Sequence, residues 1–235
     1  MTQSRPAARV VLVVSLIALS LAGFGLAAWQ VQRRAWKHAL IEAVDSRSTA
    51  KPVAAPGPDQ WPRITQDRDA YRRVTFAGRF AHDRETLVQA VTARGGGYWV
   101  LTPLVGKRFT VLVNRGFVPP DRRDPATRAA GNPAGTVRIT GLLRITEPGG
   151  GFLRSNDPGT DRWYSRDIAA IAAARGLTRT APYFIDADAA RNPGGYPVGG
   201  LTVIRFSDNH AVYAFTWLAL ALGCLFGAKL VCQRR

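Results

Sequence analysis

The sequence contains little sulfur: two cysteines and a single methionine, Met1. Cys224 and Cys232 are eight residues apart, about 12 Å along a helix, which is too far for a disulfide bond. No cysteine lies between residues 31 and 209. For that segment, this excludes a disulfide framework, a C-x-x-C redox site and covalent C-x-x-C-H heme attachment. The shortage of sulfur also argues against a copper carrier built on soft ligands.

Charge is absent from two long runs. Val10–Trp29 is twenty uncharged residues and Ala211–Ala228 is eighteen. A bilayer core requires about 20 apolar residues in a helix. We therefore predict transmembrane helices at 10–30 and 210–230.

A cleaved secretory signal is the alternative for the first run, because Gly25 and Ala27 form a small-x-small cleavage site. The apolar region of a signal peptide is normally only about 7 to 15 residues long. The length of this run favours an uncleaved anchor.

The charges that flank the second run predict its orientation. Three basic residues follow it: Lys229, Arg234 and Arg235. Because basic flanks stay preferentially in the cytoplasm, we expect a multi-pass protein of the cell inner membrane. Both tails, 1–9 and 231–235, would be cytoplasmic, and the segment 31–209 would be exported to the periplasm.

Acidic residues are few in the predicted exported segment, which has about 180 residues, the size of one domain. It holds 27 of the 32 Lys and Arg residues against all 16 Asp and Glu, so its net charge is about +11. Such an excess suits an acidic partner, an anionic lipid surface or a ligand with carboxylates. We expect no nucleic-acid partner on that side of a membrane.

The exported segment begins with a helical pattern. Val31–Val44 continues the first helix, with Trp36, Leu40 and Val44 on one face. Ser48–Pro62 then contains four prolines and a glycine, which a helix does not accommodate. We predict a juxtamembrane helix at 31–44 and a linker or extended strap along the domain at 48–62.

Short alternating or β-branched runs follow, which predict one mainly antiparallel β domain with one short helix. The helix is expected at Trp163–Leu177, capped by Ser165 and ended by Gly176. The expected strands are Tyr71–Phe80, Glu85–Val91, Tyr98–Leu104, Phe109–Asn114, Val137–Ile145, Tyr183–Ile185 and Leu201–Phe206.

Few residues in the β segment suggest chemistry. Asn114-Arg115-Gly116 is expected just beyond a strand; a turn with positive φ explains Gly116 but not Arg115, a candidate anion contact. His82 to Glu85 could offer a metal ligand or a base, but a polar turn is favoured. A G-x-S-x-G motif is missing from the sequence and only three histidines are present, which disfavours a membrane-tethered hydrolase. We expect no enzyme.

The two apolar helices carry a more specific pattern. His210 opens the second, and ionisable residues at a membrane span are candidate functional residues. At helical spacing, His210 shares one stripe with Tyr213, Ala214, Trp217 and Ala221.

A second stripe lies on the first helix and comprises Gly25, Trp29, Arg33, Trp36 and Lys37. The structural interpretation of both stripes is an aromatic belt with snorkelling bases that holds two helices together. Gly223-x-x-x-Gly227 has the spacing of a close helix contact. Spacing alone favours this structural interpretation.

Seven segments, in order between the two terminal spans, resemble the Surfeit-locus family of cytochrome c oxidase assembly factors. They are GLAAWQVQRRAWKHALI (Gly25–Ile41), FAGRFAHDRETLV (Phe76–Val88), YWVLTPL (Tyr98–Leu104), VLVNRGFVP (Val111–Pro119), SNDPGTDRWYSRD (Ser155–Asp167), PVGG (Pro197–Gly200) and NHAVYAFTWLALA (Asn209–Ala221).

This resemblance implies two membrane spans and a role in maturing heme-copper oxidases; bacterial relatives are linked to binding heme a before its insertion into the catalytic subunit. His210 matches the family histidine at the start of the second span, and Gly25–Arg33 roughly matches a G-x-W-Q-x-x-R-like stretch. The chain departs at Asp208 and Val212, where the family often has Asn and Gln, and at Phe117, where it often has Trp.

Together, the stripes and the resemblance lead to a hypothesis of transient, non-covalent heme a binding. His210 would supply an axial nitrogen to the iron, with aromatic rings against the macrocycle and basic residues at the propionates. The candidate cofactor-binding residues are His210, Tyr213, Trp217, Trp29, Arg33, Arg34, Lys37 and Arg115. The expected partners are the oxidase catalytic subunit, heme a synthase and membrane lipid; a cofactor-free scaffold that holds oxidase subunits is the alternative.

Overall fold

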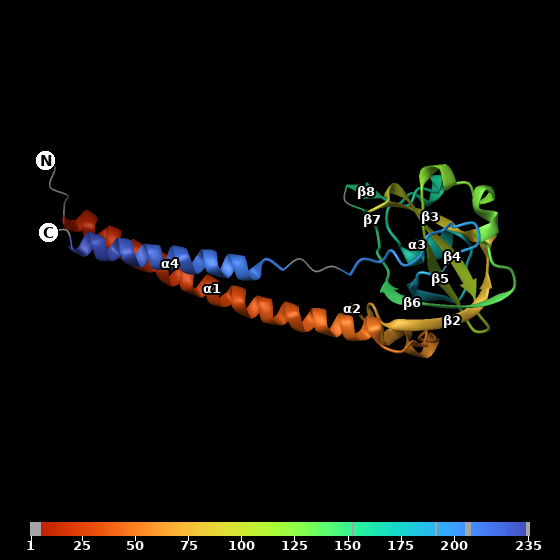
Figure 1. Ribbon diagram of the computed structural model, residues 1–235, viewed down its shortest axis with the longest axis horizontal. Helices are drawn as coiled ribbons and strands as arrows, with labels where there is room; N and C mark the ends of the chain where they lie inside the picture. The colour runs from red at the N-terminus through yellow and green to blue at the C-terminus, as the bar shows by residue number, and fades with distance from the viewer. Residues whose placement is uncertain (1–5, 152, 191, 205–207, 234–235) are drawn as a thin grey trace. The chain divides into compact units, whose positions relative to one another are not determined.

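The computed structural model describes residues 6–151, 153–190, 192–204 and 208–233. The chain divides into two compact units (Figure 1). One is a helix pair formed by α4 (His210–Gln233) and most of α1 (Pro6–Thr49). The other, residues 44–204, is a β domain.

The helix pair is antiparallel and makes its closest contact through small residues. A Cβ placed on Gly23 would lie 2.9 Å from the Cβ of Ala221. The Ser20 hydroxyl donates a hydrogen bond to the Ala221 carbonyl oxygen at 2.9 Å. The predicted contact at Gly223 is wrong, because no atom lies within 4 Å of a Cβ placed there; Gly227 reaches only the Leu16 side chain.

Both helices are long and apolar enough to span a membrane. Most of their large apolar side chains point outward; Leu21 is 68% exposed and Phe215 is 73% exposed. In water such a surface would be unfavourable, whereas lipid tails solvate it. The chain therefore has the predicted class of fold: two candidate membrane helices at its ends around a mainly β domain.

The β domain is built on a seven-stranded sheet with the order β1-β2-β6-β9-β5-β4-β3. A short β2–β4 pairing, Arg79 with Val105 and Phe80 with Leu104, closes five of these strands into a ring. All pairs are antiparallel except β1–β2 and β5–β9. The strands are β1 (Val53–Ala54), β2 (Arg73–Phe80), β3 (Thr86–Thr92), β4 (Gly95–Val105), β5 (Thr110–Val118), β6 (Thr136–Ile145) and β9 (Thr180–Ala187); β7 (Gly150–Gly151) and β8 (Arg154–Ser155) form a separate hairpin.

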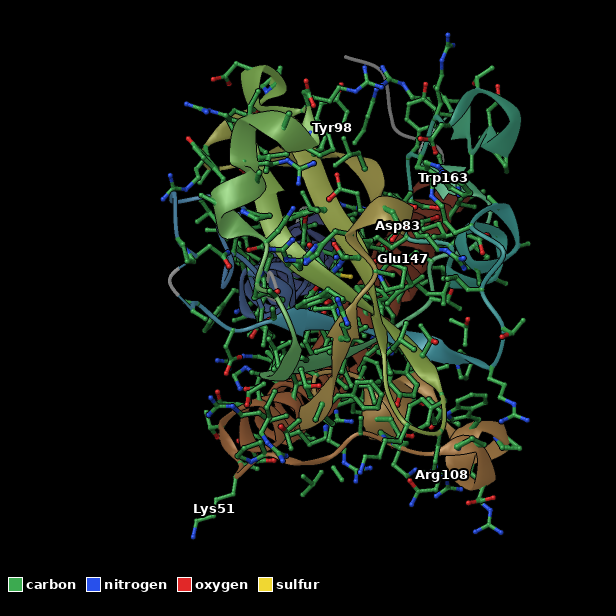
Figure 2. All side chains as sticks on the ribbon, turned by 90° about the vertical axis from the view of Figure 1, so that its right-hand side faces the viewer. Lys51, Asp83, Tyr98, Arg108, Glu147 and Trp163 are labelled. Atoms are coloured by element: carbon green, nitrogen blue, oxygen red, sulfur yellow. The ribbon has the colours of Figure 1, made fainter. Side chains whose placement is uncertain are left out.

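Apolar side chains fill both faces of this sheet, because successive residues of a strand point to opposite faces. On β5, Leu112 packs with Trp163 and Phe184 on one face, beneath the helix α3 (Ile168–Ala174). Val111 packs on the other face in a second cluster with Val74, Leu143, Ala181, Tyr183 and Ile185. Trp163, labelled in Figure 2, is only 1% exposed.

The structure corrects the predicted helix at Trp163–Leu177. α3 begins at Ile168, and its cap is Asp167, whose side chain accepts from Ala170 N. Trp163 is not helical but pairs with β3 as a strand residue would: its carbonyl oxygen accepts a hydrogen bond from Gln89 N at 2.8 Å. Ser165 is buried and donates to the Glu147 carbonyl oxygen at 2.7 Å. Gly176 follows the helix with a φ of 60°, as a stop residue should.

The bounds of several predicted strands also differ. β4 begins three residues before Tyr98, at Gly95, and β9 extends the predicted Tyr183–Ile185 to Thr180–Ala187. β5 continues four residues beyond Asn114 to Val118, so Arg115 and Gly116 lie within it. Gly116 does have positive φ (131°), and a Cβ there would meet the Val198 carbonyl oxygen at 2.1 Å. Residues 201–204 of the predicted last strand are not extended in a sheet, and its last two residues lie outside the described part.

The connecting segments contain several short helices. α1 runs to Thr49, five residues beyond the predicted juxtamembrane helix 31–44, so the first two residues of the predicted strap at 48–62 are helical. The rest of the strap contains β1, which pairs with β2, and most of the 3-10 helix η1 (Pro58–Arg63). The others are α2 (Gln66–Asp69), η2 (His82–Arg84), η3 (Pro120–Arg122), η4 (Pro125–Gly131) and η5 (Pro158–Thr160). η2 connects β2 to β3, so His82 lies in the predicted polar turn.

Candidate functional site

His210 is the first residue of α4 and is half-buried. Its backbone N–H donates to Asp208 Oδ1 at 3.2 Å, which satisfies one of the amides that a helix N-terminus leaves without an intrahelical partner. The side chain therefore starts from an ordered backbone at the end of the helix pair.

The imidazole of His210 contacts a buried amide on α1. His210 Nδ1 lies 2.8 Å from Gln30 Oε1, and Gln30 is only 8% exposed. An amide oxygen accepts hydrogen bonds and does not donate them, so with this orientation of Gln30 the proton resides on Nδ1. In the neutral form of the ring, Nε2 then keeps its lone pair, and within the described residues no group forms a hydrogen bond with it. This arrangement is typical of a histidine that ligates a metal, because the other ring nitrogen usually donates to an outer-shell acceptor.

Asp208 joins the two helices a second time. His38 Nε2 lies 2.7 Å from Asp208 Oδ2, and Arg34 Nε lies 3.5 Å from the same oxygen. The hydrogen bond from His38 lowers the pKa of Asp208 below its ordinary value, with further contributions from the His210 backbone N–H and the Arg34 charge. Asp208 is thus held as a carboxylate.

The predicted stripe on α4 faces α1 over most of its length. Ala214 and Trp217 are half-buried and Ala221 is fully buried. Tyr213 lies at the border of this face and is 53% exposed. The structure therefore gathers His210, Ala214, Trp217 and Ala221 along the helix contact, with Tyr213 beside it.

The predicted stripe on α1 points elsewhere. Trp29 and Trp36 are 53% and 55% exposed, and nothing lies within 4 Å of a Cβ placed on Gly25. The Arg33 guanidinium stacks over the Trp36 ring at 4.1 Å. A neighbouring residue lies about 100° around a helix, so Trp29 cannot share the face of Gln30. Arg34 reaches the His210 end through Asp208, and Lys37 is half-buried.

Arg115 belongs to the β domain and is buried there. Its Nη1 donates to Asn132 Oδ1 at 2.7 Å, Nη2 donates to the Gly131 carbonyl oxygen, and the guanidinium lies over the Phe80 ring at 5.1 Å. Burial lowers the pKa of Arg115 to about 10. These contacts describe an interior residue that orders the chain around it.

Comparisons with known proteins place this architecture in a family. The SURF1 family model matches residues 17–222, which include the whole β domain, the larger part of α1 and the first half of α4. The chain belongs to the SURF1 family. It is 36% identical to Surfeit locus protein 1 of Rattus norvegicus over 222 residues, covering 87% of this chain and 70% of that protein. It is also 36% identical to the Homo sapiens protein (88% and 72% covered) and 34% identical to a SURF1-like protein of Monosiga brevicollis (88% and 82% covered).

Two contacts in this SURF1 family member were not inferred from the sequence. Gln30 shares a face with Ser20 and Gly23 at helical spacing. The sequence signal for its contact with His210 was a polar amide residue between apolar ones. The Asp208–His38 pair joins residues 170 positions apart. Its signal was the acidic residue just before an apolar helix, opposite basic residues of the other helix.

Within the described residues, no three His, Cys, Asp or Glu side chains lie close enough together to hold one metal ion. His210 is therefore a single ligand candidate, assisted by Gln30.

Proposed function

We propose that this SURF1 family member is a membrane-bound assembly factor for a heme-copper terminal oxidase, cytochrome c oxidase, and that it carries heme a at the His210 end of the helix pair. It would deliver the heme to the oxidase catalytic subunit and receive it from heme a synthase. Its own role is that of a carrier rather than an enzyme. Family membership supports the assembly role, and the His210–Gln30 contact supports the heme site.

The His210–Gln30 contact carries the heme proposal. A neutral imidazole that donates through Nδ1 offers Nε2 to iron, and the outer-shell acceptor raises the basicity of the ligand. Bound heme a supplies the iron and the macrocycle, and the protein supplies orientation and release. A single protein ligand suits a carrier, because one bond is easier to exchange than two.

The neighbouring side chains have separate roles in this proposal. Trp217 and Tyr213 would pack against the macrocycle, one beside the helix contact and one facing lipid. Arg34, which contacts Asp208 beside His210, and Lys37 would pair with propionates, and Arg33 would do so only by leaving its stack over the Trp36 ring. Trp29 points outward and Arg115 is buried in the β domain, so we assign neither of them a contact with the heme.

The absorption spectrum of full-length protein purified from cells that make heme a tests the proposal. Wild type should retain heme, and His210→Ala should lose it or shift the reduced bands. Gln30→Leu should weaken retention by roughly 10- to 100-fold, the usual effect of removing an outer-shell partner. Gln32→Leu is the matched control, because Gln32 is exposed on the same helix and should retain heme like wild type.

Two results would contradict the heme site. Wild type that purifies colourless from such cells would refute heme a binding, and so would a His210→Ala spectrum identical to wild type. If the colourless protein still co-purified with the oxidase catalytic subunit, the cofactor-free scaffold would be the correct function.

We also propose the orientation that the C-terminal basic residues indicate: an inner-membrane protein with both tails in the cytoplasm and the β domain in the periplasm, beside lipid headgroups. A reporter active only outside the cytoplasm should work when inserted between Lys51 and Pro58 and fail when fused to the C-terminus. The reverse pattern would overturn this orientation. It would not bear on the heme proposal, which the absorption spectra test separately.

A further inference from the structure

A groove of about 560 Å³ lies on the β domain, beside β1, the middle of β2 and the turn between β4 and β5. Its floor includes the rings of Phe76 and Phe109, whose centroids are 4.9 Å apart. Its lining residues, all within the described ranges, include no acidic side chain but four basic ones: Arg79, Lys107, Arg108 and Arg138.

Little local charge compensates these four cations. Arg108, labelled at the lower edge of the domain in Figure 2, lies 3.2 Å from Asp59, and both side chains are largely exposed. In the part of the chain that the structure describes, no carboxylate lies within ion-pair distance of Arg79, Lys107 or Arg138. A concave surface with charges of one sign concentrates its field on whatever enters it. The groove is therefore suited to an anionic occupant.

The backbone of β2 offers a hydrogen-bonding edge inside this groove. The Thr75 carbonyl oxygen accepts from Ala55 N at 3.0 Å, so the backbone groups of Thr75 point away from β6. Those of Ala77, two residues further along the strand, point the same way. β1 pairs only as far as Thr75, and the β4 pairing begins at Arg79. Ala77 N–H and C=O thus face the groove with no strand partner among the described residues.

The side chains around Ala77 lie on two different faces of the sheet, basic ones on one face and an aromatic ring on the other. Ala77 is paired with Arg138 across the β2–β6 ladder, and Arg79 is two residues along β2, so these side chains share one face. Phe76 points to the opposite face. An extended segment that bonds to Ala77 would place alternate side chains near the two arginines and near the Phe76 ring.

We propose that this groove binds a short, extended acidic segment of a partner protein, with acidic and apolar residues in alternation. One pair of backbone hydrogen bonds to Ala77 holds the segment alongside β2, and Arg79, Lys107 and Arg138 select its charge. A lipid phosphate could use the cations but would leave the Ala77 carbonyl unpaired. The proposal goes beyond heme carriage and does not depend on it.

Fluorescence anisotropy on full-length protein in nonionic detergent tests this site, with a fluorescein-labelled octapeptide of alternating Asp and Val as the probe. We expect it to bind, and the matching Lys-Val peptide not to bind. Lys107→Gln with Arg138→Gln should weaken binding roughly fivefold or more through two lost charge contacts. Lys51→Gln with Arg94→Gln removes equal charge outside the groove and should change affinity less than twofold.

The backbone contact has its own test. Ala77→Pro removes the N–H that faces the groove and leaves the β6 ladder intact, so it should weaken binding while the circular dichroism is unchanged. An Asp-Val peptide N-methylated at its central residues should bind wild type more weakly, whether or not that variant folds. Equal binding of the Asp-Val and Lys-Val peptides, or no effect of the groove variant, would overturn the proposal. So would an Asp-Val peptide that does not bind, or a groove variant that instead loses affinity for phosphatidylglycerol vesicles.

Discussion

Different kinds of residue stabilise the inside of the helix pair and the inside of the β domain. In the β domain, large side chains such as Trp163, Tyr183 and Phe184 are almost completely buried. In the helix pair, large side chains point outward, and contact depends on Gly23 and Ala221. Lipid solvates apolar side chains as well as another helix does, so packing of small residues and hydrogen bonds must provide the contact.

This difference changes what a buried polar residue means. In the β domain, Asp186 accepts from Asn114, Arg144 and Thr202 at 2.8, 2.8 and 2.9 Å. Such a network needs no ligand, because its members satisfy one another. In the helix pair, Gln30 satisfies only one nitrogen of His210. The heme proposal rests on the other ring nitrogen, which has no partner among the described residues.

The largest effect should come from a tryptophan in the β domain. Trp163→Ala removes a fully buried ring and should lower the free energy of unfolding by about 3 to 5 kcal/mol. Trp36→Ala removes an exposed ring on α1 and should change it by less than about 0.5 kcal/mol. Guanidinium titration followed by the circular dichroism of the β domain measures both. Equal effects would show that burial does not distinguish these two regions.

An intermediate effect is expected at the helix contact. Gly23→Leu introduces atoms where even a Cβ would lie 2.9 Å from Ala221, and should cost about 1 to 3 kcal/mol of helix association. Gly25→Leu is the matched control, since a Cβ there meets nothing within 4 Å. Spin labels at Val10 and Leu230, in a chain with both cysteines replaced, should show a broadened distance distribution for Gly23→Leu alone. Broadening in both variants would argue against the observed contact face.

The smallest effect should come from acid. The pKa of Asp208 is lower in the folded chain than its ordinary value of 3.8, so its contacts with His38 and Arg34 stabilise the helix pair above that pH. Stability is lost as the pH falls below 3.8 and through the lower folded value. Spin labels at Val31 and Val212 should separate modestly in that range.

Asp208→Asn provides the control for this titration, because it cannot ionise. Its label distances should already be broader at neutral pH and should not change on acidification. If the distance distribution of the wild type broadened near neutral pH, the pH dependence would belong to another titratable group than Asp208.

Sequence patterns predicted much of the fold where each strand has one buried face. β2, β3 and β6 alternate in this way, and their positions agree with prediction within about two residues. β5 does not alternate: all nine of its residues are buried, including Asn114 and Arg115. Its end was missed because long-range pairing with β4 and β9 overrides the polar local signal.

The site was predictable in part. Spacing alone grouped His210 with Trp217 and Ala221, because a helix repeats every 3.6 residues. Gln30 was not predicted as its partner, because the antiparallel register of the two helices is set by the Gly23–Ala221 contact, which no local pattern contains. The iron-ligand role of His210 stays a prediction.

The strand order also sets when the β domain can be finished during synthesis. Among the described residues β9 is the last strand along the chain, yet it lies between β5 and β6 in the sheet. Before Thr180–Ala187 is made, the β2–β6 pair and the β3–β4–β5 meander are joined only by the short β2–β4 pairing. Only about twenty residues separate the end of β9 from α4. The sheet therefore cannot be completed until almost all of the chain before α4 has been synthesised.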